Sequence, residues 1–212
     1  MNPAELLEQF ISGLRQTTPL EFVAVVFGIG SVYYSRKEHI LVYPVGLVNT
    51  VIYVYLSIKG HLFGEASVNL FYTIMSIYGW VLWAGKDKTN KPLVQISYNT
   101  SREWIKDLTL FVVLYVALYF SLEVLKTYFA PGAIPWADAL ASAAAFTGMW
   151  LMAKKKVESW YWWIATNICS IPLYFVKGYV FTSVFYFVLL IMAFSGLIEW
   201  SKRAGSRSPV TI

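Results

Sequence analysis

The sequence is poor in charged residues and has almost no cysteine or histidine. Charged side chains make up 14% of the 212 residues, whereas a soluble domain carries about a quarter, so the surface is not built for water. The single cysteine, Cys169, excludes an intramolecular disulfide and is interpreted as a packing residue. His39 and His61 have no Cys or His partner at ligand spacing, which excludes a zinc site. No cofactor is expected.

The basic residues and the motif content also exclude several classes of function. The net charge of +5 comes from short basic groups between long apolar runs, which argues against a nucleic-acid partner. Gly85-Lys86 resembles a phosphate loop only superficially, because Asp87 stands where Ser or Thr is needed. H-E-x-x-H, G-x-S-x-G and paired acidic motifs are absent. The sequence therefore does not predict an enzyme.

Long apolar runs dominate the chain. Seven are long enough to cross ~30 Å of hydrocarbon as helices. Helices are expected because backbone groups in lipid must form their hydrogen bonds within the segment, and none of the runs has the alternating pattern of a barrel strand. They lie at Leu20–Ser35, Ile40–Ile58, Leu62–Ala84, Ile105–Phe129, Pro135–Ala153, Trp160–Lys177 and Tyr179–Trp200. Residues 1–18 are expected to form a short amphipathic helix on the membrane surface, and residues 201–212 to form a disordered cytoplasmic tail. The lipid bilayer is thus the expected environment.

The loop charges predict an orientation. Thirteen basic residues fall in loops on one side, and four fall on the other: Arg15, Lys59, Lys126 and Lys177. The thirteen are Arg36, Lys37, Lys86, Lys88, Lys91, Arg102, Lys106, Lys154, Lys155, Lys156, Lys202, Arg203 and Arg207. Because basic loops prefer the cytoplasm, we expect an inner-membrane protein with its N-terminus outside and its C-terminus inside.

An internal repeat divides the chain. Arg36, Lys37, Asn49, Lys59 and Gly60 align with Lys154, Lys155, Asn167, Lys177 and Gly178 at an offset of 118 (154 minus 36). After a one-residue deletion, Gly79 and Trp83 align with Gly196 and Trp200. Residues 19–84 and 134–200 would be three-helix bundles, and residues 85–133 a cytoplasmic loop and a linker helix. We therefore predict an all-α membrane protein of seven transmembrane helices with a 3+1+3 parallel repeat, similar to the SWEET architecture.

Aromatic residues and an asparagine share one face of the sixth apolar run. Trp160, Trp163 and Asn167 lie at i, i+3 and i+7, and Tyr174 follows near the same face. Trp160 also fits an interfacial aromatic belt. Asn167 does not, because it lies about two turns into the bilayer, where an amide needs a helix or a polar ligand as partner. These four residues are the main candidates for a binding site.

The W-x-x-W-x-x-x-N run from Trp160 to Asn167, followed by Ile171-Pro-Leu-Tyr174-Phe-Val-Lys177-Gly178, resembles the PnuC family of vitamin transporters. The Ile77-Tyr78-Gly79-Trp80 and Trp136-Ala-Asp138 runs also resemble that family. The resemblance implies facilitated diffusion of a vitamin such as nicotinamide riboside or thiamine, and trapping of the substrate by a cytosolic kinase. It leaves the substrate and any homo-oligomer open.

The residues themselves fit such a substrate. Trp faces suit a flat cationic ring, and Asn offers both a donor and an acceptor to an amide or hydroxyl. By the repeat, Asn49 is expected to face the same cavity. Asn69, Tyr72 and Tyr186 are weaker candidates, more typical of helix packing. Nicotinamide riboside is favoured because a carboxamide matches Asn167, with thiamine as the alternative, and a membrane receptor or enzyme as the alternatives of another class.

Overall fold

The computed structural model describes residues 3–60, 63–128 and 134–207, and most of them are helical. The prediction of an all-α chain is confirmed for these residues, where the extended pairing amounts to two isolated bridges. The helices are α1 Pro3–Gln16, α2 Pro19–Arg36, α3 Val42–Lys59, α4 Phe63–Ala84, α5 Ser101–Tyr128, α6 Pro135–Ala153, α7 Ser159–Val176 and α8 Val180–Arg207.

Short polar signals set several helix ends. The side chain of Thr18 accepts a hydrogen bond from the Glu21 N–H at 3.2 Å, and Pro19 occupies the first turn of α2. At α5, Thr100 and Glu103 form a reciprocal capping box, with bonds of 2.8 and 3.3 Å between side chains and backbone N–H groups. These caps fix the starts of both helices.

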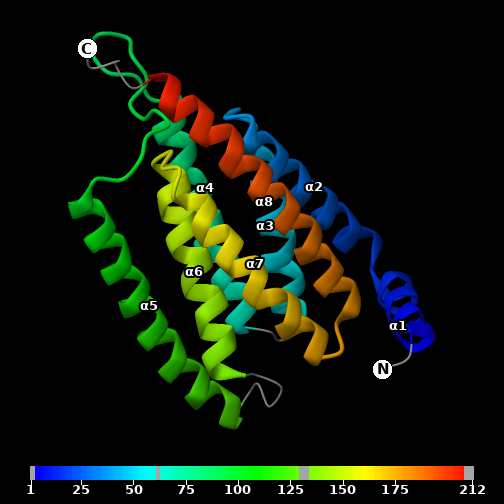
Figure 1. Cartoon of the computed structure of the whole chain (residues 1–212). Coiled ribbons are helices and arrows are strands. Elements are labelled where there is room, and N and C mark those ends of the chain that lie inside the picture. Colours follow the sequence, from blue (N-terminus) through cyan, green and yellow to red (C-terminus); the bar gives the residue numbers. More distant parts are fainter. Residues whose placement is uncertain (1–2, 61–62, 129–133, 208–212) are drawn as a thin grey trace.

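Six helices form a closed ring (Figure 1). Each packs against its two neighbours in the order α2, α3, α4, α6, α7, α8 and back to α2. Outside the ring, α5 lies along α6, and α1 lies against α8. Buried alanines on α6 allow close approach of its neighbours, as small residues do between membrane helices. The ring therefore places residues of α3, α4, α7 and α8 around a common interior.

Apolar side chains cover the outside of the molecule. On α5, Ile105, Val113 and Phe120 are all more than half exposed, a surface suited to lipid. By length and composition, three described helices could each cross a membrane, namely α3, the stretch Ser101–Thr127 of α5 and the stretch Val180–Ser206 of α8. The pair α1 and α2, bent by 105° at their junction, would add a fourth if it is one span.

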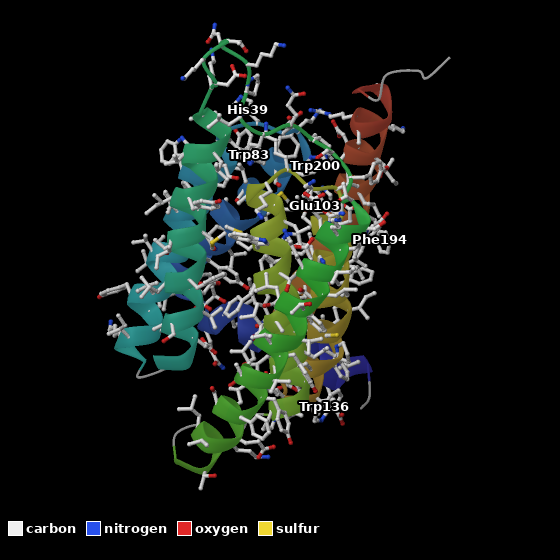
Figure 2. The ribbon with its side chains drawn as sticks, turned by 90° about the vertical axis from the view of Figure 1, so that its left-hand side faces the viewer. His39, Trp83, Glu103, Trp136, Phe194 and Trp200 are labelled. Atoms are coloured by element: carbon white, nitrogen blue, oxygen red, sulfur yellow. The ribbon has the colours of Figure 1, made fainter. Side chains whose placement is uncertain are left out.

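Two tryptophans each join two neighbouring helices at one end of the ring. Trp83, at the end of α4, donates its Nε1–H to the carbonyl of Ala153 on α6 at 3.1 Å. Trp200 on α8 donates in the same way to the carbonyl of Ser35 on α2 at 3.0 Å. Between them, the hydroxyl of Ser35 lies 3.0 Å from the sulfur of Met152, 117 positions further along the chain. We name this end of the ring, where Trp83 and Trp200 gather (Figure 2), the tryptophan end.

A buried ion pair at the tryptophan end repeats this offset. Glu38, in the α2–α3 turn, pairs with Lys155, in the α6–α7 turn, at 2.9 Å, and the two residues are again 117 positions apart. Both have a positive φ, 57° and 54°, so they hold the same place in their turns. Arg203 also reaches Glu38, at 3.2 Å.

The repeat register predicted from the sequence is wrong by one residue. Asn49 on α3 donates to the carbonyl of Ala24, 25 positions away, and Thr166 on α7 donates to that of Ala141, also 25 positions away. Asn49 therefore corresponds to Thr166 rather than to Asn167. The alignment went wrong because it matched basic residues of the two turns that hold different places in them.

The ends of the chain depart from the expected boundaries. Residues 201–207, expected to be disordered, continue α8 as helix, and the remainder of the predicted tail lies outside the described residues. Residues 3–16 form α1, a helix with one apolar face. The polar stretch before α5 is tied down: the backbone N–H of Asn99 bonds Glu158 at 2.9 Å, and its side chain bonds Asp107 at 2.7 Å.

Candidate functional site

Asn167 is a buried amide in the middle of α7. Asn167 is only 3% exposed as a residue, and no hydrogen bond joins its amide to another described residue. Its amide atoms are not among the fully buried, unpaired ones, so the amide is not sealed off within packed protein. Its counterpart one bundle away, Thr50, is satisfied, because Thr73 on α4 donates to it at 2.9 Å. A buried amide usually has a partner, since leaving it unpaired costs about 1–3 kcal/mol. Asn167 thus offers an unused donor and acceptor inside the ring.

Trp163 lies one turn before Asn167, among other aromatic rings. Its ring centroid is 6.4 Å from that of Tyr72 on α4, and Tyr72 is 5.9 Å from Phe146 on α6. Gly148 of α6 lies against this part of α7, where an added Cβ would be 3.2 Å from the Cβ of Trp162 and 3.4 Å from the Trp163 indole. The structure therefore brings Trp163 and Tyr72, both predicted site residues, to one place from opposite bundles.

A second aromatic group lies nearer the end of the ring opposite the tryptophan end. The rings of Tyr174 on α7 and Tyr186 on α8 stack with centroids 5.1 Å apart. The structure therefore brings two predicted site residues, Tyr174 and Tyr186, into contact between α7 and α8.

Trp160 has a different place. It is 1% exposed, its ring packs edge-on against Trp200 with centroids 5.6 Å apart, and it covers Gly196, where a Cβ would meet it at 2.5 Å. It belongs to the core of the tryptophan end, although its Nε1 has no hydrogen-bond partner among the described residues. The shared helical face is present, but Trp160 and Trp163 contact different neighbours.

The two other asparagines predicted for the site, Asn49 and Asn69, form hydrogen bonds with backbone carbonyls. Asn49 was expected to face the site, but its amide donates to the Ala24 carbonyl at 2.7 Å and so joins α3 to α2. The side chain of Asn69 donates to the carbonyl of Glu65 at 2.9 Å, within its own helix. That Asn49 faces the site stays a prediction, since the bond to Ala24 occupies only its N–H group. The bond of Asn69 fits the helix-packing role that is more typical of such a residue.

Sequence reasoning missed two contributors. Phe146 is the one large side chain after three alanines on α6, and Gly148 follows two residues later, against α7. That pattern, a bulky residue and a glycine in an alanine run, is a readable signal.

An ion pair lies at the end of the ring opposite the tryptophan end. Lys177 bonds both oxygens of Asp138, at 2.7 and 2.9 Å, and so joins the end of α7 to the start of α6. Asp138 also accepts the N–H of Ile134, which is the N-cap residue of α6. Asp138 thus supports the helix start from its first turn.

Comparisons with known proteins define the class. A solved structure described as the vitamin B3 transporter PnuC superposes with a TM-score of 0.70 at 25% identity, over 96% of this chain and 89% of that one. The nicotinamide riboside transporter PnuC of Escherichia coli is 23% identical over 89% of this chain and 87% of its own length. The fold is therefore that of a membrane transporter, not an enzyme.

The family follows from a longer match. The model of the family described as nicotinamide mononucleotide transporter matches residues 18–202, so the chain belongs to that family of vitamin transporters. The PnuC protein of Neisseria mucosa is 27% identical over 86% of this chain and 72% of its own. The riboflavin/roseoflavin transporter RibM of Streptomyces davaonensis is 23% identical over 87% and 85%.

Proposed function

We propose that this chain carries nicotinamide riboside across the bacterial inner membrane by facilitated diffusion. The observation that carries the proposal is Asn167, a polar residue 3% exposed in the middle of α7, one turn after Trp163. A carboxamide pairs with an amide through one donor and one acceptor, and a pyridinium ring gains from an aromatic face. Relatives named for nicotinamide riboside transport support the choice of substrate.

The proposed binding site lies within the ring. Trp163 and Asn167 would hold the nicotinamide, and the tyrosines Tyr72, Tyr174 and Tyr186 would contact the ribose hydroxyls or the ring from α4 and α8. These side chains come from both bundles, so a relative movement of the bundles would rebuild the site. Trp160 would act through packing beneath Trp163 rather than by contact.

The proposed membrane arrangement is seven spans, α2 to α8, in two parallel three-helix bundles linked by α5, with α1 on the surface. Two observations support it: the paired tryptophan bonds to Ala153 and Ser35, and the common offset of 117 at the junction. We propose that the tryptophan end faces the cytoplasm, because the basic loops gather there. A cytosolic kinase would then trap the substrate.

Substrate binding is tested by titration calorimetry on detergent-purified protein. Nicotinamide riboside should bind, and thiamine and riboflavin, the latter because RibM is a relative, should bind at least tenfold more weakly. Tight binding of either competitor without binding of the riboside would overturn the substrate while leaving the transporter class intact.

Passive transport is tested separately in proteoliposomes. Labelled riboside should equilibrate across the bilayer without any ion gradient, because the described residues of α7 carry no acid within the helix that could bind a coupling ion. Accumulation above the external concentration under a sodium or proton gradient would show that the transport is coupled.

A further inference from the structure

A cleft of about 480 Å³ lies at the tryptophan end, between the end of α2 and the C-terminal half of α8. It is separate from the proposed riboside site, since none of its lining residues belongs to that site. The lining consists of Arg36, Ser195, Ile198, Glu199, Lys202 and Arg203. Three of these side chains are cations and one is an acid.

The cations of the cleft are only partly neutralised. Glu199 pairs with Arg203 at 2.7 Å and lies 3.8 Å from the Nε of Arg36. Arg36 donates through Nη1 to the Ser195 hydroxyl at 3.3 Å, while its buried Nε has no hydrogen-bond partner among the described residues. Lys202 is exposed and makes no ion pair in the described part of the chain. The cleft therefore holds surplus positive charge, with Lys202 as its exposed cation.

An apolar strip leads away from this charge. Ile198, in the cleft wall, is 57% exposed, and Phe194, one turn earlier on α8, is 47% exposed. Figure 2 shows Phe194 on the outer edge of the molecule, away from Trp83. Beside the cleft, exposed Tyr33 lies under the guanidinium of Arg36 at 5.3 Å. A basic cleft, an interfacial aromatic and an apolar strip in this order match the layers of a membrane surface.

We infer that this cleft binds the phosphate group of an anionic phospholipid in the leaflet at the tryptophan end. The phosphate would lie between Arg36 and Lys202, and the acyl chains along Ile198 and Phe194. A soluble anion would use the same charges, but it would gain nothing from the apolar strip. The lipid would bridge α2 and α8, which belong to different bundles.

The test uses the full-length protein in nanodiscs of zwitterionic phosphatidylcholine, titrated with a short-chain phosphatidylglycerol. Lys202→Gln should weaken binding about fivefold, the effect of one cation at an anionic surface. Lys88→Gln is the matched control, because it removes the same charge from an exposed loop position and should leave the affinity unchanged. Equal affinities for wild type and Lys202→Gln would overturn the proposal.

A second arm separates lipid from soluble phosphate. Ile198→Ser should weaken binding of the lipid and leave any binding of inorganic phosphate unaltered, because only the lipid contacts the apolar strip. Inorganic phosphate or glycerol phosphate that displaces the lipid at equal concentration would mean a site for a soluble anion and would refute the lipid assignment. Riboside affinity measured in parallel should be the same in all three variants, so a failure here is distinct from a failure of the proposed function.

Discussion

Replacing Asn167 with leucine should change affinity and stability in opposite directions. In the free protein Asn167 is 3% exposed and its amide forms no hydrogen bond with another described residue, so its replacement removes no such bond. Asn167→Leu should therefore be as stable as wild type or more so. In the complex, the substrate carboxamide would lose its only amide partner and would itself be left unpaired.

The loss of binding free energy should be about 1–3 kcal/mol, the penalty for leaving a desolvated polar group of the substrate unpaired. It corresponds to a dissociation constant about 5- to 150-fold higher, at 1.4 kcal/mol for each factor of ten. Trp163→Ala should cost a similar amount through lost stacking and cation–π attraction. Because both side chains would touch one ring system, the two losses should not add in the double variant.

The assay is titration calorimetry with nicotinamide riboside on monodisperse protein, together with thermal unfolding of each variant. Thr166→Val is the matched control. It alters the neighbouring buried polar side chain, which bonds to backbone carbonyls of Trp162 and Ala141, and it should lower stability but keep the affinity. An Asn167→Leu protein that unfolds more easily yet binds like wild type would show that Asn167 serves packing, and the reasoning would fail.

Three further outcomes are expected. Gly196→Ala should destabilise the protein by about 1–3 kcal/mol in thermal unfolding, because the new Cβ meets the Trp160 ring at 2.5 Å; Gly205→Ala, with open space around it, should not. Trp200→Phe should cost about 0.5–1.5 kcal/mol by removing its bond to a backbone carbonyl, and a stability equal to wild type would argue against that bond. In a Cys169→Ala background, Lys88→Cys should resist an impermeant thiol reagent in intact cells and react after permeabilisation; labelling of intact cells would reverse the orientation.

The sequence was informative wherever a residue type has few alternative uses. Long apolar runs predicted the positions of α2 to α8 to within a few residues at most of their ends, and the tryptophan-asparagine spacing led to α7. Details that depend on one residue of register could not be read. Asn49 and Asn167 look equivalent in letters, yet only contacts in three dimensions reveal that Asn49 bonds α2.

The sequence also does not show which side chains pack against each other. Trp160 and Trp163 look alike on a helical wheel, but Gly196 and Gly148 lie beside them on different helices, and the sequence does not indicate which glycine meets which indole. The length of α8 was also underestimated, because the charges after Trp200 resemble a solvated tail. In the structure Arg203 pairs with Glu199 and Glu38, which extends the helix by another turn and more.

The common offset of 117 has a consequence for how the two halves of the chain differ. In the first half, Thr50 receives a hydrogen bond from Thr73 and so holds α3 to α4. The positions 117 further along are Asn167 and Leu190, so the aliphatic side chain of Leu190 stands where the first half has the donor of that bond. If Asn167 contacts the substrate as we propose, the second half uses a polar group for selectivity at the place where the first half uses one for packing. Substitutions in the second half should then change substrate preference more than those at the matching positions of the first half.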